Sequence, residues 1–196
     1  EMCGNGARCF ARYIQATSGG SETLSFETVC GVIHAQINGE SVTINLTDPQ
    51  GLALNERIPT SAGEQTVHSL NTGVPHAVLF VDEADAAMVS SLGEEIRFHD
   101  HFAPAGTNVN FAQIITPGHI RVRTYERGVG ETLACGTGVS ASGMIVAHLN
   151  DWPSPVKVDV LGGDTMGVAF EREGDGFSVV HLTGPADFVF TGTVEI

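Results

Sequence analysis

Two copies of one short motif carry the residues best suited to chemistry. The first is Cys3-Gly4-Asn5-Gly6 and the second is Cys135-Gly136-Thr137-Gly138, and apolar residues at helical spacing follow each copy. Each motif therefore predicts a cysteine at the start of a helix. The first-turn N–H groups of a helix have no intrahelical partner and can bind an anion such as a carboxylate. The same positive end favours thiolate over thiol, which predicts a cysteine pKa below the usual value of about 8.5.

Two such helix ends facing one another would hold one carboxylate and place a thiol on either side of its α-carbon. Two neighbouring thiols titrate as a unit, so one thiolate and one thiol can coexist as base and acid. Either motif alone is explained as well by a small buried cysteine, but the repetition favours catalysis. The pattern indicates proton transfer from one face of a carbon to the other, with the charge stabilised by the backbone N–H groups of Gly4, Asn5, Gly136 and Thr137.

The words around these motifs are longer and more specific. The sequence contains E-M-C-G-N-G-A-R-C at its start and Y-E-R-G-V-G-E-T-L-A-C-G-T-G from Tyr125. It also contains G-V-P-H at Gly73, N-V-N-F at Asn108 and Gly184-Pro185-Ala186 near its end. In these words, which run through most of the chain, it resembles the diaminopimelate epimerase family. That family interconverts LL- and meso-diaminopimelate without a cofactor or a metal.

The resemblance implies a role for each matching residue. Cys3 and Cys135 are the two acid–base residues, exchanging roles with substrate handedness. Glu126 and Arg127 line the substrate site, and the glutamate helps to set the thiol pKa values. The fixed donor fork of Arg127 suits the distal carboxylate of the substrate. Without the resemblance, Glu126 would be read as half of a surface ion pair.

Two further matches complete the predicted site. Asn108 corresponds to a substrate-binding asparagine, although an Asn in a loop turn is its ordinary interpretation. His76 corresponds to a histidine that modulates the cysteines, although a His beside a proline is more often structural. The chain departs from the family where Val74 replaces a substrate-contacting asparagine, and Asn71 or Thr72 are the candidate substitutes.

Composition agrees with an enzyme acting on a small molecule. The 196 residues are 42% hydrophobic, carry a formal charge of −14 and include one lysine, Lys157. Nucleic acid and an anionic membrane surface are therefore unlikely partners, and a homodimer is an open prediction. No apolar run approaches the roughly 20 residues that span a bilayer, and no signal peptide is visible. Four cysteines are too few for a disulfide scaffold, which favours the reducing cytoplasm.

Strand signals dominate after the first predicted helix. The Asn38-Gly39 and Pro117-Gly118 pairs predict hairpins, as do the glycine-rich stretches 162–164 and 173–176. A further helix is expected over 83–91. The predicted strands are 24–29, 32–37, 41–46, 77–81, 111–116, 119–125, 156–161, 165–170 and 177–182.

This order predicts an α+β protein of two pseudo-symmetric domains. By resemblance, mainly antiparallel strands wrap around a central helix in each domain, and the active site lies in the cleft between them. Residues 1–48 with 186–196 form the first domain and 49–185 the second, with Asp48-Pro49-Gln50-Gly51 as the boundary. Family members carry several dozen residues before the first motif. The resemblance thus implies a preceding segment, either removed from this chain or missing from the sequence.

Two other functions compete with this interpretation. Another two-cysteine racemase, such as a proline racemase, shares the double motif but usually has His where Asn5 stands. A thiol-based metal or redox protein is disfavoured because neither Cys3 nor Cys135 has a close Cys or His partner. His99-Asp100-His101 lacks a third ligand and is read as a polar loop. Cys9 and Cys30 are expected to be structural.

Overall fold

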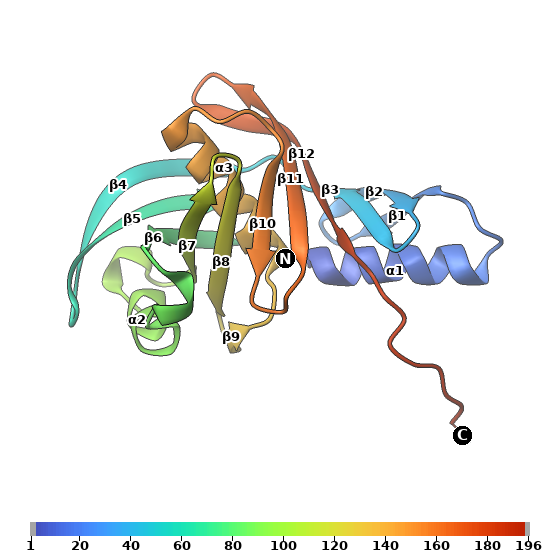
Figure 1. Ribbon diagram of the computed structural model, residues 1–196, viewed down its shortest axis with the longest axis horizontal. Coiled ribbons are helices and arrows are strands. Elements are labelled where there is room, and N and C mark those ends of the chain that lie inside the picture. The colour runs from blue at the N-terminus through green and yellow to red at the C-terminus, as the bar shows by residue number, and fades with distance from the viewer. Residues whose placement is uncertain (1–2, 195–196) are drawn as a thin grey trace.

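Twelve strands pair into one continuous sheet within residues 3–194, which the computed structural model describes (Figure 1). Along the sheet the order is β1-β2-β3-β12-β11-β10-β8-β7-β6-β5-β4, and the short β9 pairs with β8. The β6–β7 and β8–β10 pairs are parallel, and the others are antiparallel. The strands are β1 Thr23–Thr28, β2 Gly31–Asn38, β3 Ser41–Asn45, β4 Gln50–Thr60, β5 Gly63–Asn71, β6 Pro75–Phe80, β7 Asn108–Thr116, β8 His119–Glu126, β9 Gly130–Thr132, β10 Val156–Val160, β11 Thr165–Glu173 and β12 Gly176–Pro185.

The first helix, α1 (Gly4–Thr17), lies along β1, β2 and β3 (Figure 1). Its small residues Ala7 and Ala11 are buried, Phe10 packs its partly exposed ring edge-on against Phe26 of β1, and Tyr13 is about half exposed. The helix is therefore amphipathic, with one stripe toward the sheet and one toward solvent.

The third helix, α3 (Gly136–Asn150), is enclosed by the sheet and is buried from Gly136 to Ala147. Glycine, alanine and serine at many of its positions let the strands approach closely: a Cβ atom on Gly143 would lie only 3.3 Å from Val168. The opposite face of β6 and β7 is covered by α2 (Val89–Arg97), which packs in a second, smaller core. Because α3 is buried on all sides, it forms the centre of the main core, whereas α2 buries only one face.

Every strand predicted from the sequence is present, as is the mixed α+β class. Asn38 pairs with Ser41, so the first hairpin turn is centred on Gly39 and Glu40, one residue later than expected. The helix expected over 83–91 is wrong: residues 84–86 form a 3₁₀ turn and α2 begins at Val89. Its apolar stripe comes from Val89, Leu92 and Ile96, which pack into the second core.

The strands β4, β5 and β9 are present in the structure but are not predicted from the sequence. The β4 strand contains Gly51, Asn55 and Pro59, which disfavour regular strands, and Asn55 has a positive φ of 59°. Its pairing with β5 shifts register twice, between Gln50 and Ala53 and between Ala53 and Glu56. These irregularities break the alternation that identifies a strand in a sequence.

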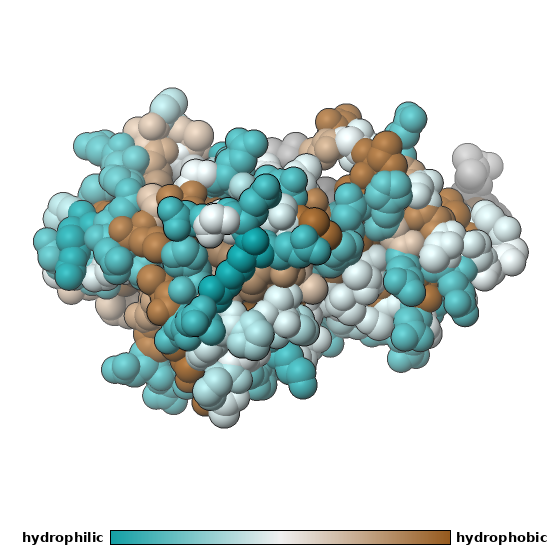
Figure 2. All heavy atoms as spheres, turned by 90° about the horizontal axis from the view of Figure 1, so that it is seen from above, coloured by the Kyte–Doolittle hydropathy of each residue, from teal (hydrophilic) through white to brown (hydrophobic). Residues whose placement is uncertain are grey.

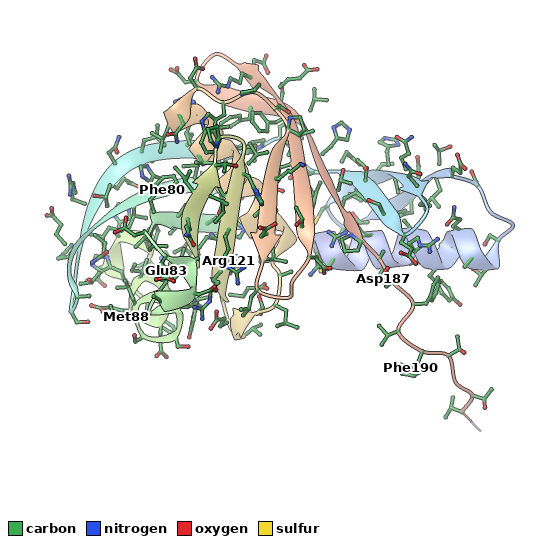
Figure 3. All side chains as sticks on the ribbon, in the orientation of Figure 1. Phe80, Glu83, Met88, Arg121, Asp187 and Phe190 are labelled. Carbon is green, nitrogen blue, oxygen red and sulfur yellow. The ribbon has the colours of Figure 1, made fainter. Side chains whose placement is uncertain are left out.

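The long strand β12 joins the two parts of the sheet. It pairs with β11 along one edge and with β3 along the other, so the C-terminal strand packs beside the N-terminal strands β1–β3. Beyond it, the Ala186 N–H donates to the Glu40 carbonyl at 3.0 Å. Residues 186–194 form no strand, and this tail, with Phe190 on it, runs away from the body of the protein (Figure 3).

Surface composition shows no continuous apolar face in the view from above. Figure 2 shows apolar residues there as separate groups among hydrophilic ones. In the described part of the chain, no helix is both long and apolar enough to cross a membrane.

Candidate active site

The two cysteine motifs meet at the N-termini of α1 and α3. Cys3 is the N-cap of α1 and Cys135 is the N-cap of α3. The backbones of Gly4 and Gly136 are in contact, because a Cβ atom added to Gly136 would lie 3.5 Å from the Gly4 Cα. The Asn5 amide adds a second link, donating from Nδ2 to the Ala134 carbonyl at 3.0 Å. The structure therefore brings together the two helix ends that the sequence pattern pairs.

Glycine is required at both contact positions. A Cβ atom on Gly4 would lie 2.9 Å from Leu182 Cδ2, and one on Gly136 would lie 2.8 Å from the same methyl group. Leu182 of β12 is fully buried, so it has little room to retreat. Glycine at these two positions thus has a packing cause: one leucine fills the space beneath both.

Arg8 supports this junction and was missed in the sequence analysis. It is 5% exposed; its Nε donates to the Pro185 carbonyl at 3.3 Å and its Nη2 to Asn5 Oδ1 at 2.9 Å. Among residues 3–194 its buried Nη1 has no hydrogen-bond partner, and burial lowers the pKa of Arg8. The signal was available, since Arg8 lies one turn after Gly4 on the buried face of α1.

The two thiols differ in environment. Cys3 is exposed and its sulfur accepts from the Gly6 N–H at 3.4 Å, whereas Cys135 is 7% exposed. Burial raises the pKa of Cys135 to about 11, with the Glu126 carboxylate adding to the effect and the Thr137 hydroxyl opposing it. The expectation that a helix N-terminus lowers the thiol pKa is therefore wrong for Cys135, because desolvation penalises its thiolate more strongly.

The remaining cysteines lie outside the helix junction. Cys9 is exposed, so the expectation that it packs in the protein is wrong. Cys30 is partly buried and packs against the main core. Cys30 and Cys3 both border a largely apolar hollow of about 400 Å³, whose lining residues are Cys3, Gly6, Ala7, Phe10 and 26–30.

Strand alternation directs the other predicted side chains toward the start of α3. On β6 and β7, Ala77, Leu79, Val109 and Phe111 face α2, so His76, Asn108 and Asn110 face α3. On β8 the same rule places Thr124 and Glu126 on that face. Glu126 lies beside the Cys135 thiol, and its Oε1 accepts from the Thr132 hydroxyl at 2.6 Å.

Asn108, the first residue of β7, contacts Arg127 in the turn after β8. Asn108 Oδ1 accepts from the Arg127 backbone N–H at 2.7 Å. The Arg127 side chain donates from Nη1 to the Ala105 carbonyl at 3.2 Å, and this bond connects the turn after β8 to the loop that precedes β7. The structure brings both residues to the same edge of the site.

His76 is buried and is joined to α3 through a threonine. Its Nε2 lies 3.0 Å from Thr137 Oγ1, which in turn lies 3.5 Å from Cys135 Sγ. Its Nδ1 lies 3.2 Å from Asn110 Nδ2. Burial, with the nearby Arg127 charge, lowers the pKa of His76 to about 3, so its ring is neutral at physiological pH.

The polar side chains in the segment around Val74 form hydrogen bonds with backbone groups. Val74 is buried, and the Thr72 hydroxyl donates to the Thr137 carbonyl at 3.0 Å. Asn71 Oδ1 accepts from the Gly73 N–H at 3.0 Å and shapes the turn. Of the two candidate substitutes for the family asparagine, Thr72 holds this loop against α3 and Asn71 stabilises the turn itself.

A metal site is not formed by the described side chains: no three His, Cys, Asp or Glu residues gather closely enough in residues 3–194. In the 99–101 segment, His99 Nδ1 accepts from the His101 N–H at 3.1 Å. His101 pairs with Glu56 at 3.0 Å between Nε2 and Oε1. These contacts give the polar loop expected there.

Solved structures with a similar fold include a probable proline racemase and a hydroxyproline epimerase. A probable proline racemase from Agrobacterium radiobacter K84, with bound carbonate, superposes on the chain with a TM-score of 0.76. The match covers 100% of this chain and 68% of that one at 20% identity. A hydroxyproline epimerase from Agrobacterium vitis gives a TM-score of 0.71 at 20% identity, over 91% of this chain and 62% of that one. At this identity the likeness shows the fold alone.

Sequence relatives are much closer. The family model described as diaminopimelate epimerase matches residues 68–189. The diaminopimelate epimerase of Hydrogenobaculum sp. (strain Y04AAS1) is 43% identical over 201 residues, and that of Aquifex aeolicus (strain VF5) is 42% identical. Each alignment covers 100% of this chain and 70% of the relative. The chain belongs to the diaminopimelate epimerase family, a family of isomerases.

Proposed function

We propose that this protein interconverts LL- and meso-diaminopimelate by two-base proton transfer between Cys3 and Cys135. The observation that carries the proposal is the contact between the two cysteine-capped helix ends at Gly4 and Gly136. The relatives are named diaminopimelate epimerase and align with the whole length of this chain, which supports the choice of substrate.

The chemistry follows from opposed thiols. One sulfur, as thiolate, takes the α-proton from one face, and the other, as thiol, delivers its own proton to the opposite face. The C–H bond broken and the C–H bond formed are on the same carbon, so no electrons are gained or lost. The enzyme is left with the two protonation states exchanged, and proton exchange with water restores them. The N–H groups at the two helix starts bind the α-carboxylate and stabilise its growing charge.

Cys135 acts as the acid for one handedness of the substrate and as the base for the other. In the ligand-free protein Cys135 is a thiol, because its pKa lies at about 11. It is therefore ready to act as the acid. When the substrate has the other handedness, Cys135 is the thiolate that takes the α-proton and Cys3 is the thiol that delivers one, and Glu126, by resemblance, helps to set the thiol pKa values. His76, by resemblance, modulates the same thiol, and Thr137 connects the two.

The distal end of the substrate is assigned to Arg127 and Asn108. The start of β7 and the turn after β8 bring them together at the edge of the site, where the guanidinium fork suits a carboxylate and the amide suits an ammonium or carboxylate group. Lysine lacks the distal carboxylate, so it should be a poor substrate. Because remote binding orients the reacting carbon, the loss should fall on kcat as well as on KM.

The domain division and the setting are proposals of the same kind. Residues 1–48 with 186–196 would form one unit and 49–185 the other, with α1 and α3 as the central helices that meet at the site. The reaction uses both sulfurs as free thiols, which suits a reducing compartment such as the cytoplasm.

A substrate panel tests the proposal. The intact protein is incubated with LL-diaminopimelate, L-lysine or L-proline, and the stereoisomers are separated by chiral chromatography. The proposal expects rapid formation of meso-diaminopimelate and little reaction with the other two. Equal racemisation of proline or lysine would contradict it and would favour a general two-cysteine racemase.

A further inference from the structure

A buried chain of hydrogen bonds runs from the sheet to the Cys135 sulfur, and its directions follow from one amide. Asn110 is fully buried on β7. Its Nδ2 lies 2.9 Å from the Ala77 carbonyl, which only accepts, so this atom is the NH₂ group. Its Oδ1 accepts from the Thr124 hydroxyl at 2.9 Å. Both ends of the Asn110 amide are thus assigned by partners on the neighbouring strands.

The second Nδ2 proton of Asn110 is directed at His76. Nδ2 lies 3.2 Å from His76 Nδ1, which must therefore present a lone pair. A neutral imidazole with a bare Nδ1 carries its proton on Nε2. That proton is donated to Thr137 Oγ1 at 3.0 Å. The threonine oxygen is then an acceptor toward the histidine, and its own hydrogen remains for Cys135 Sγ at 3.5 Å.

We propose that Asn110, held by Thr124, is a positioning residue that fixes the Nε2–H tautomer of His76 and so aims the Thr137 hydroxyl proton at the Cys135 sulfur. The inference deepens the role of the proposed epimerase site and rests on it for its catalytic meaning. A hydroxyl hydrogen bond stabilises a thiolate more than a thiol, so the chain counteracts the desolvation of Cys135.

Close packing keeps this series of hydrogen bonds in place. A Cβ atom on Gly138 of α3 would overlap Asn110 Oδ1 and lie 3.2 Å from His76 Cε1, so the helix start sits directly against the pair. His76 is 1% exposed, which leaves little access for water to exchange its partners. The charged and titratable groups around Cys135 are Glu126 of β8 beside the sulfur and His76 of β6 behind Thr137, with Arg127 acting on His76.

The tautomer is measured directly by NMR. Long-range ¹H–¹⁵N correlation on the ¹⁵N-labelled intact protein, from pH 5.5 to 8, distinguishes protonated from bare ring nitrogens. His76 is assigned as the histidine whose signals disappear in His76→Gln. The expected result is a non-titrating ring with Nε2 protonated and Nδ1 bare. An Nδ1–H tautomer, or a ring that becomes imidazolium in this range, would overturn the proposal.

Substitution of Asn110 should reverse the direction of the hydrogen bonds through His76. In Asn110→Asp, the carboxylate accepts from Nδ1–H, so the proton should move to Nδ1 and Nε2 should become the acceptor. Asn45→Asp on β3 is the matched control, because Asn45 Oδ1 already accepts from the His34 N–H and should leave the His76 tautomer unchanged. An unchanged tautomer in Asn110→Asp would refute the positioning role. Should that variant not fold, the wild-type tautomer still decides.

The far end of the chain is read out at the sulfur. At pH 9, alkylation of Cys135 by iodoacetamide, followed by peptide mass spectrometry, should slow about tenfold in Thr137→Val, because the thiolate loses a hydrogen bond. Thr137→Ser should restore the rate. Thr43→Val, which removes a hydroxyl bonded to Thr183 at 2.8 Å elsewhere in the sheet, is the control. Equal rates in Thr137→Val and wild type would contradict the proposal. Neither readout uses diaminopimelate, so failure of the epimerase assignment would be seen separately.

Discussion

The glycine contact between the two helix starts should be indispensable for activity. Gly136→Ala is the sharpest perturbation, because Gly136 has an ordinary helical backbone that alanine can adopt. The only obstacle is space: the new Cβ atom would lie 2.8 Å from Leu182 Cδ2 and 3.5 Å from the Gly4 Cα. Since ordinary contact begins at 3.4 Å, α3 or its neighbours must move by about half an ångström.

This geometry predicts the loss of stability and the loss of activity separately. Overpacking in a filled core costs about 1–3 kcal/mol, and the better helix propensity of alanine returns up to about 1 kcal/mol. The free energy of unfolding should therefore fall by up to about 3 kcal/mol. Activity should fall further, because displacement of a reacting group by about 1 Å can cost a hundredfold in rate. We expect a loss of ten- to a hundredfold in kcat for Gly136→Ala.

The assay compares stability and turnover in Gly136→Ala, a control variant, Leu182→Val and the double variant. Urea unfolding gives the free energy, and chiral chromatography gives kcat for diaminopimelate epimerisation. Gly167→Ala is the control, because its Cβ atom would meet only Thr183 Cβ at 3.7 Å, an ordinary contact. Leu182→Val removes the obstructing methyl group, so Gly136→Ala should cost less stability in that background than alone. Wild-type kcat in Gly136→Ala, or an equal loss in Gly167→Ala, would refute the reasoning.

Four further results are expected. Cys3→Ala and Cys135→Ala should each abolish epimerisation while leaving the unfolding transition nearly unchanged; measurable turnover in either variant would contradict the two-base scheme. Mild oxidation should join Cys3 to Cys135 and inactivate the enzyme until reductant is added, and peptide mapping would reveal any other pairing. Because the pKa of Cys135 is raised to about 11, its alkylation rate should climb as pH rises toward that value, and Glu126→Gln should shift the climb to lower pH; an unshifted profile would exclude the carboxylate as a cause. Arg127→Lys should lower kcat/KM for diaminopimelate at least about tenfold, since the bidentate fork is lost, and unchanged kinetics would remove Arg127 from the distal carboxylate.

Local signals account for what the sequence predicts well. A cysteine followed by glycines and an apolar helical pattern identifies the start of α1 and of α3, and both are found there. Hairpins such as 116–119 are predicted by a glycine with positive φ at the turn. The meeting of the two motifs follows from their repetition and from the family resemblance. It needs no knowledge of the rest of the fold.

Properties that depend on tertiary packing were out of reach. The pKa of Cys135 is set by how deeply α3 is buried and by Glu126 across the site, neither of which the C-G-T-G motif encodes. Asn110 and Thr124 are paired by the register of β7 and β8, so their contact with His76 appears only when the strands are aligned. The β4 strand was missed because its breakers are accommodated by two register shifts in its pairing with β5.

The position of deuterium after a single turnover tests the central claim most directly. LL-diaminopimelate is incubated with the intact protein in heavy water, and both stereoisomers are isolated at low conversion for NMR. If Cys3 and Cys135 act on opposite faces, the meso product carries deuterium at the inverted α-carbon, while the recovered LL substrate stays unlabelled. A product that retains its α-proton, or deuterium entering the recovered substrate as fast as product forms, would contradict two-base transfer between these thiols.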